Sequence, residues 1–135
     1  MRKLAAAALL LAAGPALADG IEITVAGEAN GVIVIDLFED VAPNHVERIT
    51  TLAAGGSYDG SVFHRVIDGF MAQTGDVQHG RLGGDMRRAG MGASEMPNLD
   101  AEFSDVPYDR GIVGMARAQN PNSANSQFII MFNEG

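Results

Sequence analysis

The sequence predicts a mainly β fold in which one helix covers an open end of an antiparallel sheet or barrel. Three observations support this fold class. Short segments with strand-like alternation or β-branched runs are separated by turns rich in Gly, Asn and Pro. Residues 43–53 carry apolar side chains at helical spacing. Glycine contributes 17 of the 135 residues and Trp none, which is typical of a turn-rich globular chain.

Length, charge and cysteine content restrict the class of protein. A chain of 135 residues is long enough for one domain with a single core. The formal net charge of −8 disfavours a nucleic acid or an anionic membrane surface as partner. Because the chain has no Cys, it forms no disulfide and carries no lipid on Cys.

Residues 1–18 have the pattern of an export signal. Arg2 and Lys3 supply its positive end, and residues 4–13 form an apolar run too short to cross a bilayer as a stable helix. Ala16-Leu17-Ala18 fits a cleavage site. We expect cleavage between Ala18 and Asp19, and no membrane insertion afterwards. The alternative is a buried Ala/Leu helix at the start of the fold.

The expected product is a mature domain of residues 19–135. Loss of the two basic residues leaves 7 Lys and Arg against 17 Asp and Glu, a net charge of −10. Export of a chain without Cys suits a bacterial periplasm, which is the location we expect, with secretion as the alternative.

Two strands are predicted directly after the signal. Residues 21–25 alternate apolar and polar side chains, and residues 32–38 form a longer β-branched run. Asn30-Gly31 between them is a hairpin signature. We therefore expect an antiparallel pair.

A helix of about three turns is predicted next. Pro43 suits the first helical turn, and two acidic residues just upstream favour its positive end. Gly55-Gly56 ends the helical pattern. His45 and Glu47 are expected in solvent. The apolar positions are Val46, Ile49 and Ala53.

Residues 63–76 contain the first candidate functional residues. Alternation along a strand puts Phe63, Arg65 and Ile67 on one face. Beyond a glycine the stretch adds an aromatic ring, a thioether and an amide: Phe70, Met71 and Gln73. A guanidinium beside these groups indicates a shallow apolar pocket with a fixed donor. The alternative is an ordinary strand whose Arg65 lies in solvent.

The segment from residue 80 to residue 109 is expected to be loop. Residues 80–85 are Gly-rich but lack the Gly-Lys-Ser/Thr ending of a phosphate loop, which argues against nucleotide binding. Such a long loop in a compact domain is usually functional or wrapped on the surface. The three histidines, His45, His64 and His79, lack metal-ligand spacing, so no metal site is expected.

Residues 111–132 are interpreted as a strand, a polar turn and a second strand. Gln127 lies at the start of the otherwise apolar second strand, where a buried amide needs a partner or a ligand. Taken alone, Gln127 is better explained as a loop-end residue satisfied by backbone groups.

Together the two stretches resemble the cyclophilin family of peptidyl-prolyl cis-trans isomerases. The motifs are Phe-His-Arg-Val-Ile at residues 63–67, Gly-Phe-Met-Ala-Gln-Thr-Gly-Asp at 69–76, Gly-Met-Ala-Arg at 114–117 and Ser-Gln-Phe at 126–128. The likeness extends over nearly all of residues 21–132, in the order of the family. The Met-Ala-Gln-Thr-Gly-Asp and Met-Ala-Arg variants look like the bacterial branch.

The resemblance implies a cyclophilin-like antiparallel β-barrel with a capping helix, and roles for single residues. Arg65 is the implied catalytic residue, and no cofactor or metal is needed. His64 is taken as structural. The implied substrate-binding residues are Phe70, Met71, Gln73, Ala116, Arg117, Gln127 and Ile129. The implied partners are proline-containing peptides, unfolded client proteins and a cyclosporin-type ligand.

Two departures from the family pattern stand out. Ile129 occupies a position that is commonly a second pocket aromatic, so we expect weaker packing against proline. The family also continues beyond residue 135 with further strands and a second helix, so the chain is expected to be a C-terminally incomplete domain whose barrel lacks its closing strands.

Two functions of different class follow from these features. The first is a prolyl isomerase that assists protein folding outside the cytoplasm. The second is a peptide-binding or chaperone-like module on the same scaffold with little catalysis. Arg65, Gln73 and Gln127 favour the first, whereas Ile129 and the shortened C-terminus favour the second.

Overall fold

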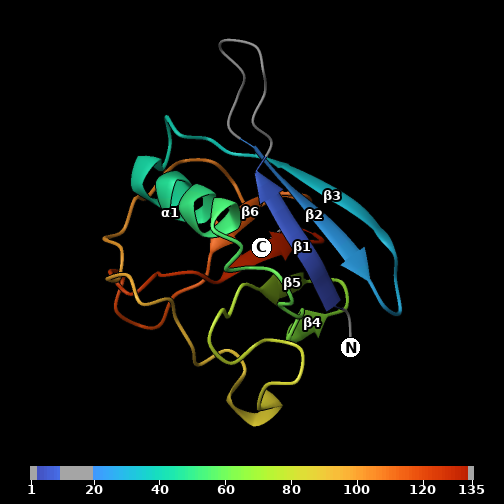
Figure 1. Cartoon of the computed structure of the whole chain (residues 1–135). Helices are drawn as coiled ribbons and strands as arrows, with labels where there is room; N and C mark the ends of the chain where they lie inside the picture. The colour runs from blue at the N-terminus through green and yellow to red at the C-terminus, as the bar shows by residue number, and fades with distance from the viewer. Residues whose placement is uncertain (1–2, 10–19, 134–135) are drawn as a thin grey trace.

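The computed structural model describes residues 3–9 and 20–133 as two antiparallel sheets, one α-helix and long loops (Figure 1). The first sheet has the order β1-β2-β3 and the second the order β4-β5-β7-β6. The strands are β1 (Lys3–Leu9), β2 (Gly20–Ala26), β3 (Gly31–Asp36), β4 (Arg65–Ile67), β5 (Met71–Thr74), β6 (Val113–Met115) and β7 (Phe128–Met131). The helices are α1 (Pro43–Ala54) and the short 3₁₀-helix η1 (Met86–Arg88).

The predicted pair of strands after residue 20 is confirmed as the β2–β3 hairpin. The strands pair from Gly20 opposite Asp36 to Val25 opposite Gly31. The connection is longer than the two-residue turn that Asn30-Gly31 suggests, because Gly31 already belongs to β3. Asn30 instead closes the turn with its side chain, whose Oδ1 accepts a hydrogen bond from Gly27 N at 3.3 Å.

Part of the predicted export signal is a described strand. Residues 3–9 pair antiparallel with β2, opposite residues 21–26. The cleavage position between Ala18 and Asp19 lies outside the described residues, so cleavage stays a prediction. Within the described ranges, no helix is long and apolar enough to cross a membrane.

Helix α1 begins and ends where the sequence predicts. Pro43 occupies the first turn, and the Gly55 N–H bonds back to Thr51 O at 3.0 Å. Its buried face includes Val46, Ile49, Leu52 and Ala53. The expectation for Glu47 is confirmed, since it is exposed.

The expectation that His45 lies in solvent is wrong. His45 is buried, and its backbone N–H donates to Glu102 Oε1 at 2.9 Å. Glu102 also accepts from Asn44 N at 3.1 Å, and its carboxylate pairs with the His45 imidazole. The N-cap residue Ala42 has no side-chain oxygen to offer, so this distant carboxylate satisfies the free N–H groups of the first turn.

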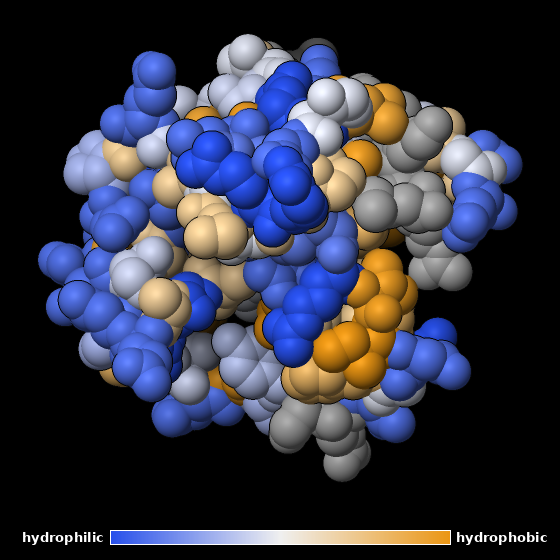
Figure 2. All heavy atoms as spheres, turned by 90° about the horizontal axis from the view of Figure 1, so that it is seen from below, coloured by the Kyte–Doolittle hydropathy of each residue, from blue (hydrophilic) through white to orange (hydrophobic). Residues whose placement is uncertain are grey.

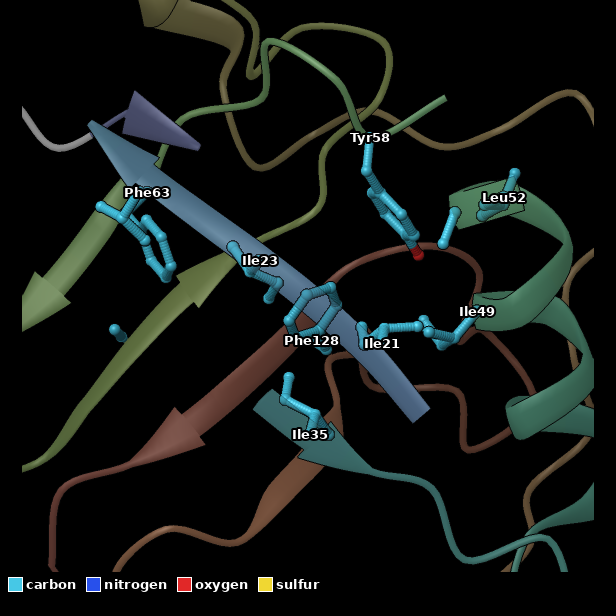
Figure 3. Packing of buried hydrophobic residues seen from close by; sticks show 11 residues of the cluster. Ile21, Ile23, Ile35, Ile49, Leu52, Tyr58, Phe63 and Phe128 are labelled. Atoms are coloured by element: carbon cyan, nitrogen blue, oxygen red, sulfur yellow. The ribbon is translucent and has the colours of Figure 1, made fainter. Parts of the chain in front are cut away.

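The hydrophobic core joins both sheets to α1. Figure 3 shows side chains from β2, β3, α1 and β7 pointing toward one another around Phe128. Tyr58 packs edge-to-face on Phe128, with ring centroids 5.7 Å apart, and its hydroxyl donates to Ser126 O at 2.7 Å. Burial raises the pKa of Tyr58, so its hydroxyl stays a donor.

Phe63 belongs to this core, which corrects one expectation. It is 5% exposed, whereas Arg65 is exposed. Strand β4 begins only at Arg65, so the regular alternation assumed for residues 63–67 does not extend back to Phe63. Phe63 therefore packs in the core beside the start of β4 and does not flank Arg65.

The mainly β architecture with antiparallel sheets and one covering α-helix is confirmed. Within residues 3–9 and 20–133, however, the strands form two separate sheets and not one closed barrel. An apolar cavity of about 650 Å³ opens between them. Its walls include Ile33, Ile35, Val46, Val113 and Ile130.

Candidate active site

The β4–β5 hairpin brings the two most informative side chains together. The sequence between Arg65 and Gln73 turns back on itself at Gly69, whose φ of 73° suits glycine, and Phe70 N bonds to Ile67 O at 3.0 Å. As a result Arg65 stands opposite Gln73 in the ladder. Residues that pair across strands share a face of the sheet, so both side chains project from the same side.

A row of hydrogen bonds runs from Arg65 into the interior. Arg65 Nη1 donates to Gln73 Oε1 at 3.4 Å, and Gln73 Nε2 donates to Gln127 Oε1 at 2.8 Å. Exposure decreases along the row, from the exposed Arg65 to Gln127 at 9%. The guanidinium therefore stays accessible to a ligand, while the Gln73 amide that it contacts is held in place by Gln127.

Gln127 is itself held by the backbone of a loop. Its Nε2 donates to Gly90 O at 3.0 Å and to Gly92 O at 2.9 Å. The interpretation of Gln127 as a residue satisfied by backbone groups is thus confirmed. In addition, Gln127 contacts Gln73, so it joins the loop to the row that ends at Arg65.

Asp76 fastens the same loop from the other side. The carboxylate is fully buried, and Oδ2 accepts from Gly90 N at 2.7 Å and from Gly92 N at 3.0 Å. Oδ1 accepts from Gln78 N at 3.0 Å and from His79 N at 2.8 Å. Desolvation raises the pKa of Asp76, but these backbone donors together outweigh it and hold the pKa below its usual value.

Two glycines permit this close packing. A Cβ on Gly92 would lie 2.1 Å from Asp76 Oδ1, which leaves room for no other residue. Gly75 has a φ of 92°, and a Cβ there would lie 2.6 Å from Ser126 O. Gly92 therefore permits the close approach of the loop to the Asp76 carboxylate, and Gly75 permits the close approach of the chain after β5 to the backbone of Ser126.

Three consecutive residues before β7 hold two distant segments of the chain, one at Gly75 and one at residues 90–94. Asn125 Oδ1 accepts from Ser94 N at 2.9 Å, and Ser126 Oγ donates to Gly75 O at 2.7 Å. Gln127 holds the loop at Gly90 and Gly92, as described above. The segment 125–127 is thus the point at which the loops of the site converge.

The other predicted site residues surround this row to different degrees. Phe70 is 41% exposed beside the hairpin turn, and the half-buried Ile129 stands opposite Gln73 on the face of Arg65. The Ala116 N–H donates to Gln127 O at 2.9 Å. The exposed Arg117 donates from Nη1 to Ala118 O at 2.9 Å.

Met71 is placed differently from the other pocket candidates. It shares the face of Gln73 in β5, but it is 1% exposed and reaches no solvent. Its predicted contact with a proline ring stays a prediction. In this structure Met71 supports the hairpin from within.

His64 lies behind Arg65, against the loop. A Cβ on Gly90 would sit 3.3 Å from His64 Nε2, and neither ring nitrogen has a hydrogen-bond partner among the described residues. Desolvation lowers the pKa of His64; the Asp76 carboxylate raises it in part, and Arg65 lowers it further. His64 is therefore a neutral packing residue at neutral pH, which fits the structural role expected from the sequence.

The arrangement forms a shallow donor site and not a deep cavity. None of Arg65, Gln73 and Phe70 lines the cavity between the sheets. The exposed apolar side chains of this hairpin are Val66, Ile67 and Phe70, of which Ile67 shares the face of Arg65 in β4. Seen from the end that carries the yellow loop of Figure 1, the surface is mainly hydrophilic, with an apolar area on one side (Figure 2). Such a site is suited to an extended, partly apolar ligand with an acceptor for Arg65.

Asp76, Gly90 and Gly92 are residues of this site for which the sequence predicts no role. The signal for Asp76 is a carboxylate two residues after the strand ends at Thr74 and before a Gly-rich loop, a position from which Asp commonly binds backbone N–H groups. Gly90 and Gly92 carry no comparable signal, because their partners come from distant parts of the chain.

Comparison with known proteins gives a consistent family. Residues 21–135 match the model of the cyclophilin type peptidyl-prolyl cis-trans isomerase/CLD family. A probable peptidyl-prolyl cis-trans isomerase of Brucella suis is 56% identical over 108 residues, covering 78% of this chain and 55% of the relative. Peptidyl-prolyl cis-trans isomerase B of Escherichia coli is 37% identical over 101 residues, covering 75% of this chain and 57% of the relative.

Solved structures agree with this result. A Cryptosporidium parvum cyclophilin type isomerase, crystallised in the presence of the dipeptide Ala-Pro, superposes with a TM-score of 0.64 at 31% identity, covering 78% of this chain and 64% of that chain. A cyclophilin from Hirschia baltica gives a TM-score of 0.63 at 27% identity, covering 78% and 55%. The chain spans about half the length of the curated relatives it matches.

Proposed function

The chain belongs to the cyclophilin-type peptidyl-prolyl cis-trans isomerase family, and we propose that the protein catalyses rotation about X-Pro peptide bonds. The observation that carries this proposal is the row from Arg65 through Gln73 to Gln127. It presents an accessible guanidinium that bonds to the half-buried Gln73, which is held in turn by the buried Gln127.

The chemistry of the reaction calls for such a donor. Rotation about an X-Pro bond takes tens to hundreds of seconds without a catalyst, because amide resonance must be broken. In the twisted transition state the prolyl nitrogen regains a lone pair and becomes a better acceptor. A donor to this nitrogen is worth more in the transition state than in the ground state, which is what catalysis requires. The Arg65 guanidinium is protonated at any physiological pH and supplies this hydrogen bond.

The substrates that fit the site are proline-containing segments of peptides or unfolded proteins. The exposed ring of Phe70 and the side chain of Ile129 offer apolar surface for the proline ring. The backbone at Ala116 and Arg117 adjoins Gln127 and is proposed to pair with the peptide. The crystallisation of the Cryptosporidium relative with Ala-Pro supports this substrate class.

We further propose that the protein acts on folding clients outside the cytoplasm. The support is the charge and hydropathy pattern of residues 1–18. Expression of the chain in a bacterial host, followed by fractionation and N-terminal sequencing, is expected to give a periplasmic product that begins at Asp19. Replacement of Ala18 by Arg is expected to prevent this cleavage. An unprocessed wild-type chain retained in the cytoplasm would contradict the proposal.

The activity is tested with a short X-Pro peptide and the full chain, beside Arg65→Ala. Arg88→Ala is the matched control, because it removes one exposed cation elsewhere on the surface. Activity that is lost in Arg65→Ala and kept in Arg88→Ala is the expected result. Equal activity in both variants would place the catalytic donor elsewhere.

The second candidate is a peptide-binding module with little catalysis. It is favoured by Ile129, which stands where the family pattern commonly has an aromatic residue. A folded chain that binds proline peptides in a titration but leaves their isomerisation rate unchanged would support this candidate over the enzyme.

A further inference from the structure

We propose that Asp76 is a positioning residue of this site: its carboxylate sets the segment from Gly90 to Gly92, whose carbonyls orient Gln127, and through Gln73 this fixes the guanidinium of Arg65. The consequence for catalysis rests on the proposed isomerase function. The structural coupling does not depend on it.

The first step is the closure of the loop by one carboxylate. Gly90 and Gly92 lie 14 and 16 positions beyond Asp76, and both donate to the same oxygen, Oδ2. The other oxygen holds the turn at Gln78 and His79 directly after the strand. Because Asp76 is 0% exposed, water does not compete for these bonds. The carboxylate thus fixes where the Gly90–Gly92 backbone lies relative to β5.

The second step is the dual use of Gly90 and Gly92. Each gives its N–H to Asp76 and its C=O to Gln127. Two carbonyls that converge on one amide nitrogen allow only one orientation of the Gln127 amide, since the flipped amide would bring Oε1 against both of them. The loop therefore selects the orientation of a side chain that lies outside it.

The third step is the transfer of this orientation to Arg65. With Nε2 of Gln127 directed at the loop, its Oε1 faces Gln73 Nε2 at 2.8 Å. Gln73 must then present Oε1 to Arg65, as it does at 3.4 Å. In the opposite orientation Gln73 would present N–H groups to a guanidinium that is itself only a donor. The orientation of both amides, and with it the acceptor that Arg65 meets, is therefore set by the loop that Asp76 holds.

The experiment compares Asp76→Asn with Asp85→Asn. Asparagine keeps the shape of Asp76 but replaces one acceptor oxygen by an NH₂ group. Asp85 is the matched control because it is an acid of the same loop that caps η1, and its carboxylate bonds only to Arg87 among the described residues. The readouts are kcat and KM with a proline peptide, the free energy of unfolding, and the NMR signal of the Arg65 Nε–H group.

Asp76→Asn is expected to lower kcat by roughly 10- to 100-fold per folded molecule with little change in KM, because the donor is misplaced and not removed. The Arg65 signal is expected to shift or broaden in Asp76→Asn and to stay in place in Asp85→Asn. A less stable Asp76→Asn protein with unchanged kcat and an unchanged Arg65 signal would overturn the proposal, since Asp76 would then only fasten the loop. If the wild-type chain shows no isomerase activity, the Arg65 signal alone decides.

A second pair of variants keeps the test decisive where Asp76→Asn does not fold. Gly90 and Gly83 both have positive φ values, 94° and 79°, so an alanine costs similar backbone strain at either position. Only Gly90 contacts Asp76 and Gln127, whereas a Cβ on Gly83 meets nothing within 4 Å. Gly90→Ala is expected to shift the Arg65 signal and Gly83→Ala to leave it unchanged. Equal effects of the two variants would overturn the proposal.

Discussion

Glu102 holds the first turn of α1 from a position 57 residues away from His45, whose backbone N–H and imidazole both meet its carboxylate. Replacing Glu102 by Gln leaves one acceptor oxygen and removes the negative charge from the helix N-terminus. We expect a loss of about 1 kcal/mol in the free energy of unfolding, measured with urea. The exposed Glu95 supplies the control, Glu95→Gln, which is expected to change stability by less than about 0.5 kcal/mol.

The stabilisation by Glu102 depends on pH in a defined direction. Desolvation raises the pKa of Glu102, but the hydrogen bonds from His45 and Asn44 outweigh it and lower the pKa below the ordinary value of 4.5. A lowered pKa in the folded state contributes stability that is present above the ordinary pKa and is lost as pH falls through the lowered one. The difference in stability between wild type and Glu102→Gln is therefore expected to be full above pH 4.5 and to shrink in more acidic solution. A difference that grows on acidification would contradict this assignment.

His64 is expected to titrate below its ordinary value of 6.5, because burial next to Arg65 disfavours the charged ring. A folded state that binds the proton less readily than the unfolded state is destabilised as pH falls from above 6.5 through the lowered pKa. An NMR titration of the His64 ring protons measures the midpoint directly. A midpoint at or above 6.5 would show that the Asp76 carboxylate dominates its surroundings.

The variant Arg65→Lys tests whether catalysis needs the planar guanidinium group or only a positive charge at this position. Lysine keeps the positive charge but loses the planar group that reaches Gln73 and a ligand together. We expect kcat/KM for a proline peptide to fall on the order of 100-fold, with the unfolding transition unchanged because Arg65 is exposed. Retention of full activity would mean that charge alone suffices at this position.

Tyr58→Phe removes a buried hydrogen bond from beneath the site. The hydroxyl donates to Ser126 O, and the ring contact with Phe128 is kept in the variant. The expected cost is about 1 kcal/mol in the free energy of unfolding. Full stability in Tyr58→Phe would show that Ser126 O finds another donor.

Ile129→Phe is expected to improve the binding of proline peptides. Ile129 stands opposite Gln73 on the face of Arg65, and an aromatic ring there offers more contact to a proline ring. We expect the binding free energy of the peptide to improve by about 1 kcal/mol, which corresponds to a roughly fivefold lower KM. A KM that stays constant or rises would place the proline ring away from β7.

The parts of the fold that depend on neighbouring residues could be predicted from the sequence. Pro43 and Gly55 bound α1 by local backbone preferences, and the strands of the β2–β3 hairpin follow from their β-branched runs. The placement of His45 in solvent failed because its environment is made by Glu102, far along the chain. No local pattern carries that information.

In the candidate site, too, the residue types could be predicted from local motifs, whereas their contacts with distant residues could not. The motif predicts Arg65, Gln73 and Gln127 as site residues, and the structure brings their side chains into one row. What the motif does not reveal is that Gly69 folds residues 65–73 into a hairpin, so that Arg65 meets Gln73 across two strands. The contribution of Asp76 depends on bonds to residues 14 and 16 positions away, which spacing alone does not predict.

The convergence of distant segments on residues 125–127 has a consequence for folding of the chain as the ribosome synthesises it. The partners of this segment, including Tyr58, Gly75 and Gly92, are all synthesised before it. Until β7 emerges, the strand pair of β4 and β5 lacks its neighbour, and the loop at residues 90–94 lacks the bonds to Asn125 and Gln127 that add to those of Asp76. The row behind Arg65 therefore cannot form from local contacts alone, and we expect it to be completed only after residue 127 has been synthesised, because Gln127 is distant in sequence from Gln73.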